Sequence, residues 1–320
     1  MKKLWLTALV ALCTMQAEAR ADDYPSKPIT MVNPGPPGGA IDSVARIIAE
    51  AMTNDLKQKV IMLNLDGAGG TIATARVAHA APDGYTVLFH HIGIATAPAL
   101  YKQLQYDTLK DLTPVGLTTE VPMVLLARKG FPPNTVAELV AYLKEQGKGI
   151  LMATAGPGNV SDLCASVLQR QLKTSFTTVP YRGSPPALLD IEGDRVDFMC
   201  DQTSTAASQI TAKAVRAYGV AAKSRLPILA DVPTLTEQGL PFVFSIWQGV
   251  YVPAGTPEPI IRRLSESLQH ALASETVKAK LAPLGVTMLD PSRATPAAHA
   301  AFLQGELKHW ADIYKDTPKL

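Results

Sequence analysis

The sequence has few aromatic residues, few charges and few cysteines for its length. Aromatic side chains make up 6% of the 320 residues and charged side chains 18%, whereas 47% of the residues are hydrophobic. This balance is typical of a packed α/β protein and excludes a disordered chain. The sequence also lacks a basic run or a basic-aromatic patch, so it is a poor candidate for nucleic-acid binding. The length allows two lobes of ordinary size.

Long apolar runs are missing as well, apart from one near the start. Met1-Lys2-Lys3 is a basic head, residues 4–15 form an apolar stretch too short to span a bilayer, and Ala19-Arg20-Ala21 fits a cleavage site. We expect residues 1–21 to be a signal peptide that is removed after Ala21. Cys13 does not indicate a lipoprotein anchor, because Leu12 stands where a small residue would be needed. The mature chain would carry 27 basic and 27 acidic residues, a formal charge of zero.

Two cysteines, Cys164 and Cys200, remain after cleavage. In an oxidising compartment an even pair suggests one disulfide. Two separate buried thiols are the alternative, because the sequence does not give the distance between the Cα atoms.

Short apolar segments alternate with segments of helical spacing along the whole chain. The expected strands are residues 29–32, 60–65, 86–90, 124–127, 150–155, 176–181, 196–200, 216–222 and 244–252. The expected helices are residues 41–56, about 71–80, 135–146, one from about 161, a short one after Pro233, 259–273, 275–284 and 296–314. Strands followed by glycine loops and helices predict parallel crossover units, and hence an α/β fold with open sheets.

No low-complexity linker divides the chain, so we expect two lobes joined by crossing strands. Lobe 1 is predicted to comprise residues 22–123 and 243–320, with the C-terminal helices extending partly over lobe 2. Lobe 2 is predicted to comprise residues 124–242.

Three glycine-rich loops each precede a helix, at residues 34–39, 66–70 and 156–159. A helix N-terminus presents unpaired N–H groups and a positive dipole end, and bare backbone lets an anion approach closely. Ligands of open parallel sheets sit at the carboxyl ends of the strands. The loops therefore suggest an anion-binding cleft between the lobes, although each loop alone is also explained as a plain turn.

Other motifs do not develop into sites. Ile72 replaces the third glycine of a dinucleotide loop, and there is no Walker motif. His90 and His91 lack a third metal ligand at a recognisable spacing, so a structural pair is expected there. We predict neither a metal nor a cofactor.

Several segments together resemble one family. They are Tyr24-Pro25-Ser26-Lys27-Pro28-Ile29, Pro37-Gly38-Gly39-Ala40-Ile41-Asp42, Asn64 through Gly70, Asp83-Gly84-Tyr85-Thr86, Val179-Pro180-Tyr181-Arg182-Gly183, Val232-Pro233-Thr234 and Pro253-Ala254-Gly255-Thr256-Pro257. In this order, over essentially the whole mature chain, the sequence resembles the Bug family, the TctC-like periplasmic substrate-binding proteins of tripartite tricarboxylate transporters.

The resemblance implies a type II periplasmic-binding-protein fold, with mixed, mostly parallel sheets in two lobes that close on a small carboxylate. It implies a periplasmic protein that is not an enzyme, is expected to be a monomer, and works with the membrane permease subunits of the transporter. The carboxylate is expected to be held by main-chain N–H groups and ordered waters, with few charged side chains.

Carried over by position, the resemblance assigns ligand contacts to both lobes. In lobe 1 these are Gly38, Gly39, Ala40, Asp42, Asn64, Gly67, Ala68, Gly70 and His91. In lobe 2 they are Gly158, Asn159, Ser161, Arg182, Asp201 and Thr203.

Four side chains have competing interpretations. Asp42 either orients the first loop or a water, or stabilises the helix N-terminus. Ser161 is also explained as a simple N-cap. Arg182 either pairs with a second carboxylate or is a solvated surface residue. Trp247 is more simply a core residue than a ligand stack.

Leu163-Cys164 with Cys200-Asp201-Gln202 resembles the citrate-type branch, which favours a di- or tricarboxylate as ligand. An aromatic (di)carboxylate is the alternative. Two other functions remain open, an exported enzyme that uses Asp42, His91 or Asp201, and a sensor subunit with the same pocket.

Overall fold

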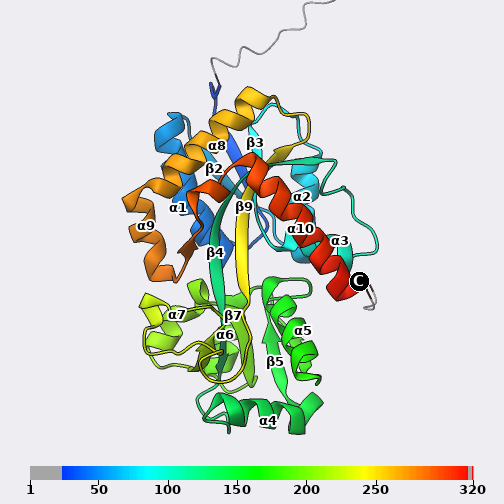
Figure 1. The fold of residues 1–320 in the computed structure, drawn as a ribbon, viewed down its shortest axis with the longest axis vertical. Helices are drawn as coiled ribbons and strands as arrows, with labels where there is room; N and C mark the ends of the chain where they lie inside the picture. Colours follow the sequence, from blue (N-terminus) through cyan, green and yellow to red (C-terminus); the bar gives the residue numbers. More distant parts are fainter. Residues whose placement is uncertain (1–23, 316–318, 320) are drawn as a thin grey trace, which may run out of the picture.

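The computed structural model describes residues 24–315 and residue 319, and Figure 1 shows two bodies stacked along the long axis of the molecule. The expected signal peptide, with Cys13, lies outside the described residues. Within the described part, no helix has the length and apolarity needed to cross a membrane. We call the upper body of Figure 1 lobe 1 and the lower body lobe 2.

Lobe 1 is built on a mixed sheet in the order β2-β1-β3-β9-β4, with β10 added on β4. β2, β1 and β3 are parallel to one another, whereas β9 runs antiparallel to both β3 and β4. The strands are β1 (Ile29–Asn33), β2 (Val60–Asn64), β3 (Thr86–His91), β4 (Leu112–Ala127), β9 (Ser245–Pro253) and β10 (Thr287–Met288).

Lobe 2 repeats the mixed arrangement in the order β4-β7-β5-β6, with β8 also paired to β4. β5 is parallel to β6 and β7, and β4 is antiparallel to β7 and β8. The strands that β4 joins here are β5 (Leu151–Thr154), β6 (Thr177–Pro180), β7 (Phe198–Gln202) and β8 (Arg216–Val220).

β4 is one long strand that serves both sheets, as Figure 1 shows. Its first part, from Leu112 to Pro122, pairs with β9, and from Met123 onward it pairs with β7 and β8. The chain returns next to it, where the Met123 N–H donates to the Phe244 carbonyl at 3.0 Å. The lobes are therefore joined by crossing strands, and each lobe has an α/β architecture. The precise domain borders stay a prediction.

Helices cover both faces of each sheet. In lobe 1, α1, α8 and α9 pack on one face and α2, α3 and α10 on the other; in lobe 2, α4 and α5 lie on one face and α6 and α7 on the other. Their bounds are α1 (Ala40–Leu56), α2 (Thr71–Ala78), α3 (Gly93–Leu100), α4 (Val136–Gln146), α5 (Val160–Leu172), α6 (Ser184–Glu192), α7 (Thr203–Thr211), α8 (Glu258–Ala273), α9 (Glu275–Leu281) and α10 (Pro296–Tyr314).

One apolar core runs through both lobes. It follows one face of β4 and includes Leu117, Leu125 and Phe244, together with Trp247 and Trp310. The end of α10 reaches α5, because an Arg170 guanidinium nitrogen donates to the Ile313 carbonyl and the guanidinium lies over the Tyr314 ring. Packing thus makes the junction between the lobes continuous.

The secondary structure departs from the sequence expectation in three ways. β4 begins at Leu112, twelve residues before the expected strand, since cross-strand pairing with β9 overrides the breaking effect of Pro114 and Pro122. α3, α6 and α7 form where no helix was expected. The short helix expected after Pro233 is wrong; residues 235–239 are turns instead.

Candidate ligand-binding site

The parallel strands of both sheets point their carboxyl ends toward the boundary between the lobes. Residues that follow β1, β2, β5 and β6, together with the last residues of β3 and β7, line two adjoining cavities there. This is the position that ligands occupy in open α/β sheets.

The main cavity has a volume of about 190 Å³ and the small cavity about 30 Å³. Both are lined by Pro34, Pro36, His91, Ala155, Asn159 and Gly183. The main cavity is further lined by Asp66, Gly67, Ala68, Gly69, Gly70, Gly156, Pro157, Tyr181 and Arg182. The small cavity adds Gly35, Gly39, Ala40, Ile41, Val160, Ser184 and Gln202. Backbone therefore forms much of the wall, contributed by both lobes.

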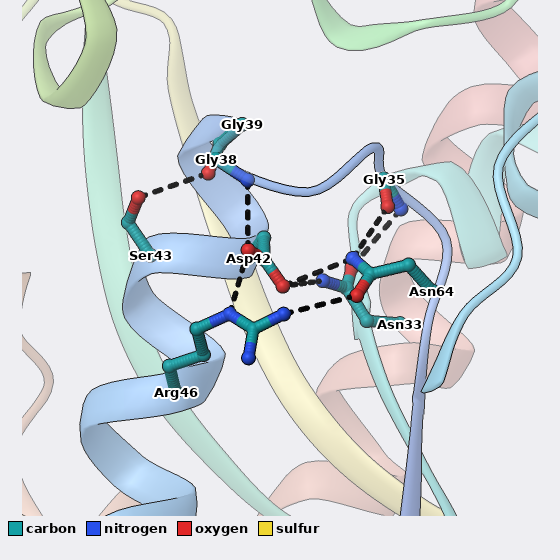
Figure 2. Close-up of polar contacts among 8 residues, drawn as sticks. All are labelled: Asn33, Gly35, Gly38, Gly39, Asp42, Ser43, Arg46 and Asn64. Atoms are coloured by element: carbon teal, nitrogen blue, oxygen red, sulfur yellow. Dashed lines mark hydrogen bonds and ion pairs between the residues drawn. The ribbon is translucent and has the colours of Figure 1, made fainter. Parts of the chain in front are cut away.

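The first loop is held from behind by Asp42, whose side chain is 2% exposed. One carboxylate oxygen accepts from Gly38 N–H and Arg46 Nε, both at 2.8 Å. The other accepts from Asn64 Nδ2 at 2.9 Å and Asn33 Nδ2 at 3.1 Å (Figure 2). Through Asp42, the four contacts join the start of α1 to the loop and to the ends of β1 and β2.

These donors determine the charge of Asp42. Burial alone would raise the pKa of the carboxyl, but hydrogen bonds from Arg46, Gly38 and Asn64 lower the pKa below its ordinary value. Asn64 also donates to the Gly35 carbonyl at 2.8 Å, and Gly35 N–H donates to Asn33 Oδ1 at 3.0 Å (Figure 2). Asp42 and Asn64 therefore shape the first loop, and neither lines a cavity.

The loop of lobe 2, residues 156–159, repeats this backbone geometry. We call residues 34–39 the first loop and residues 156–159 the second loop. Gly158 N–H donates to Asp162 Oδ2 at 2.9 Å, as Gly38 N–H does to Asp42, and the φ angles of the two glycines are 70° and 77°. Such angles favour glycine. Within the described part of the chain, Asp162 has no counterpart of the Asn64 and Arg46 contacts. Burial therefore outweighs its one hydrogen bond, from Gly158, and raises the pKa of its carboxyl.

Both helices begin without a side-chain cap. The N-cap residues are Gly39 for α1, which has no side chain, and Asn159 for α5, whose side chain makes no capping hydrogen bond. Asn is among the best N-cap residues, so an Asn159 side chain that lines the cavities and leaves the helix uncapped is unusual. The first N–H groups of α1 and α5 thus lie uncapped beside the same cleft.

The lobes approach closely at one end of the main cavity. A Cβ on Gly158 would lie 2.6 Å from the Tyr101 hydroxyl, and a Cβ on Gly69 would lie 3.0 Å from the Gly158 carbonyl oxygen. Tyr101 and Gly69 belong to lobe 1. The absence of a side chain at Gly69 and Gly158 therefore allows the two lobes to approach this closely.

The structure brings about half of the predicted site residues together on the cavity walls. These are Gly39, Ala40, Gly67, Ala68, Gly70, His91, Asn159 and Arg182. The others do not line either cavity; besides Asp42 and Asn64 they are Gly38, Gly158, Ser161, Asp201 and Thr203. The amides of the two glycines are directed to Asp42 and Asp162.

The remaining three side chains stabilise lobe 2 and the junction. Ser161 Oγ accepts from Ala155 N–H at 2.5 Å, so it bonds the loop before α5 and does not cap the helix. Asp201 accepts from Ser184 and Thr205 hydroxyls at 2.6 Å each, and burial raises the pKa of its carboxyl against these bonds. Thr203 donates to the carbonyls of Pro122 and Gly285.

Three further side chains line the cavities. Ser184 was not predicted, whereas Gln202 and Tyr181 were recognised as parts of family-like segments but were not among the predicted ligand contacts. Side chains alternate across a strand, so a choice between Asp201 and Gln202 depends on a register that one residue reverses. The family resemblance indicated the strand-end segment of residues 201–203. Within that segment, the pleat of β7 directs Gln202 to the small cavity.

Cys164 of α5 and Cys200 of β7 form a disulfide, with Cα atoms 6.1 Å apart. The bond joins the helix that starts at the second loop to the strand that ends at Gln202. Trp247 is buried in the core, and its Nε1 donates to Glu306 at 2.8 Å.

A larger groove of about 480 Å³ lies between α1, α8 and α9, away from the strand ends. Most of its charged groups are paired, since Asp55 accepts from Arg263 and contacts His270, and Lys280 donates to Glu50. We therefore place the candidate site in the smaller cleft cavities, where backbone donors converge. Within residues 24–315 and 319, no group of three or more His, Cys, Asp or Glu side chains is placed to hold a metal ion.

Comparisons with known proteins agree with this geometry. Residues 44–318 match the model of the tripartite tricarboxylate transporter family receptor. The chain is 43% identical, over 98% of its length and 90% of the relative, to the UPF0065 protein in the TAR-I ttuE-ttuC' intergenic region of Agrobacterium vitis.

Two solved structures share the fold over 91% of this chain. The periplasmic binding protein BugD is 42% identical with a TM-score of 0.85 and 98% of its chain covered. MatC from Rhodopseudomonas palustris with bound malate is 41% identical with a TM-score of 0.85 and 100% of its chain covered. The chain therefore belongs to the tripartite tricarboxylate transporter receptor family, the periplasmic solute-binding proteins that include the Bug proteins.

Proposed function

We propose that the protein is exported, cleaved after Ala21, and captures a small carboxylate in the cleft for delivery to the permease subunits of a tripartite tricarboxylate transporter. The observation that carries the proposal is the pair of uncapped helix starts, α1 and α5, which come from opposite lobes and line one small cavity. Two dipole ends and their free amides favour an anion placed between them.

Closure of the lobes would complete this site. Each lobe supplies one helix start, so an anion contacts both only when the lobes meet. Binding energy is then spent on holding the closed form, which is how a hinged receptor signals occupancy to its permease.

An aliphatic di- or tricarboxylate is the favoured ligand class. MatC, 41% identical to this chain, has malate bound. Arg182 lines the main cavity, and a guanidinium there favours a ligand with a second carboxylate. Tyr181 is the one aromatic ring of a Phe, Tyr or Trp residue on the described cavity walls, which gives an aromatic dicarboxylate less to stack on.

We propose no reaction. Asp42 and Asp201 have their carboxylate oxygens turned to donors inside their own lobes. Neither lines a cavity, so neither is within reach of a substrate proton as a general base must be. A sensor subunit would use the same pocket and differ in its partner alone.

Isothermal titration of the mature chain with malate, succinate, adipate, citrate, terephthalate and acetate tests the ligand class. We expect at least one aliphatic dicarboxylate to bind with a micromolar or lower Kd, and acetate to bind far more weakly. Folded protein that binds none of these compounds would refute the proposal, and tight binding of terephthalate alone would favour the aromatic alternative. Capture of the detergent-solubilised permease subunits by ligand-loaded protein tests the transport role.

A further inference from the structure

Gln202 ends β7 in lobe 2 and has an unused donor. Its side chain is 5% exposed and lines the small cavity. Its Nε2 atom is buried and has no hydrogen-bond partner among the described residues. A buried donor without a partner costs about 1–3 kcal/mol, so such a group calls for an acceptor that enters the cavity.

His91 ends β3 in lobe 1 and lines the same cavity. Its side chain is 6% exposed, and its Nδ1 accepts from Gly93 N–H at 2.8 Å. Burial, together with the neighbouring His90, holds the pKa of His91 well below its ordinary value, so the ring is neutral at physiological pH. A neutral ring whose Nδ1 accepts must carry its proton on Nε2. His91 thus offers one N–H donor of fixed identity.

The neighbouring His90 differs from His91, because neither of its ring nitrogens is available to a ligand. Its Nδ1 accepts from His91 N–H at 2.8 Å and its Nε2 lies 3.4 Å from the Gly70 carbonyl. Both nitrogens are used inside lobe 1, and His90 lines neither cavity.

We propose that the Gln202 amide, from lobe 2, and the His91 Nε2–H, from lobe 1, are specificity-determining donors. Together they hold one carboxylate of the ligand in the small cavity. The inference rests on the proposed function and adds to it the side chains that select the ligand. The uncapped starts of α1 and α5 line the same cavity, so amide donors surround the group on several sides.

The sizes of the cavities define the class of ligand. About 30 Å³ is room for one small polar group such as a carboxylate. The rest of the ligand then extends into the main cavity, toward Arg182. The ligand is a short acid with one carboxylate buried against neutral donors and a second acidic group at the wider, charged end.

Neutral donors explain why this end is selective for a carboxylate. None of the described residues that line the small cavity is a Lys or an Arg, so the free protein does not bear the desolvation cost of an unpaired cation there. A carboxylate accepts from several donors at once, whereas a primary amide group brings N–H groups that meet the Gln202 and His91 donors head on.

The test uses the mature protein, malate and the malate derivatives in which either carboxylate is replaced by a primary amide, all by isothermal titration. Gln202→Glu places oxygens where the donor was, so we expect malate affinity to fall by about 100-fold. The same variant should bind one of the amide derivatives better than malate, which reverses the wild-type preference. Gln103→Glu, which makes the same change at an exposed position, should leave the affinity within about twofold.

His91 is tested by two variants of similar size. His91→Leu removes the donor, and we expect a loss of at least about tenfold, whereas His91→Gln restores an N–H near Nε2 and should recover most of it. Wild-type affinity should be constant between pH 6 and 8, because the donor is a neutral ring.

The outcomes separate the two proposals. Wild-type protein that binds no acid of the panel refutes the proposed function. Wild-type protein that binds malate, while folded Gln202→Glu and His91→Leu bind it within about threefold of wild type, overturns this inference alone. If Gln202→Glu does not fold, the change in preference is measured on Gln202→Leu, for which we expect the selectivity for malate over its amides to collapse.

Discussion

The two loops that face each other across the cleft start their helices in the same way and are held by different chemistry. In each, a glycine amide donates to the aspartate four residues on, Gly38 to Asp42 and Gly158 to Asp162. Asp42 accepts three further hydrogen bonds from Asn33, Arg46 and Asn64. Among the residues that the structure describes, the glycine amide is the one hydrogen-bond partner of the Asp162 side chain, and α5 is anchored instead by the disulfide between Cys164 and Cys200.

The same backbone shape is therefore stabilised by a polar network in one loop and by a covalent bond near the other. The pKa of Asp42 is lowered and that of Asp162 is raised. The first loop therefore depends on a charge, and the second loop tolerates a neutral acid. Four predictions test whether the two loops differ in this way.

Asp42→Ala should have the largest effect. It leaves two asparagine amides, an amide N–H and a guanidinium without their acceptor, so we expect the free energy of unfolding to fall by about 3 kcal/mol. Asp162→Ala removes one bond and should cost about 1 kcal/mol or less. Urea unfolding of both variants measures the difference, and equal losses would show that the two aspartates act alike.

Loss of the disulfide should rank second. The Cys164→Ala, Cys200→Ala double variant removes a cross-link between residues that are 36 positions apart in the sequence. We expect the free energy of unfolding to fall by about 2–4 kcal/mol. Dithiothreitol added to wild-type protein should lower the thermal midpoint in the same direction and leave the double variant unchanged. If the first loop rather than the second limits ligand affinity, the double variant will still bind the ligand at temperatures where it is folded.

Gly158→Ala should weaken ligand binding by about tenfold, because its Cβ would lie 2.6 Å from the Tyr101 hydroxyl of the other lobe. Gly38→Ala is the matched control; no heavy atom lies within 4 Å of its Cβ, so it bears the cost of the positive φ alone, about 1 kcal/mol. Titration of the ligand measures both. Tyr101→Phe in the Gly158→Ala background removes the nearest atom and should restore part of the affinity; no recovery would locate the effect in the loop itself.

Asp162→Asn should have the smallest effect at neutral pH, within about 1 kcal/mol of wild type, since Asn Oδ1 can still accept from Gly158. The sign of its pH dependence is the sharper test. A raised pKa means that folded wild type binds the proton more readily than unfolded chain, so wild type gains stability relative to Asp162→Asn as pH falls toward about 4.

For Asp42 the sign is reversed. Its lowered pKa stabilises the fold above the ordinary carboxyl pKa, and wild type should lose its advantage over Asp42→Asn as pH falls below about 4. Urea unfolding at several pH values gives both slopes. Parallel slopes for the two pairs would contradict the assignment of charge to one loop and tolerance to the other.

The amino-acid sequence was sufficient to predict the order of most elements and the loops that line the cleft cavities. Apolar spacing predicted helices such as residues 41–56 and 296–314 within a residue of α1 and α10, since a helix with one buried face must repeat its apolar residues at that period. Glycine loops before helices predicted the cavity walls at Gly39, Gly67 and Asn159. The family resemblance was also readable from short segments.

Which side chains face the cleft depends on contacts that form only in the folded protein. Asp42 and Asn64 turn toward each other behind the first loop, Asp201 turns to Ser184, and the next residue, Gln202, faces the small cavity. Likewise, β4 extends back to Leu112 because β9, more than a hundred residues later, supplies its hydrogen bonds. Contacts between segments remote in sequence set strand length and pleat, and local patterns carry no information about a partner that the chain has not yet reached.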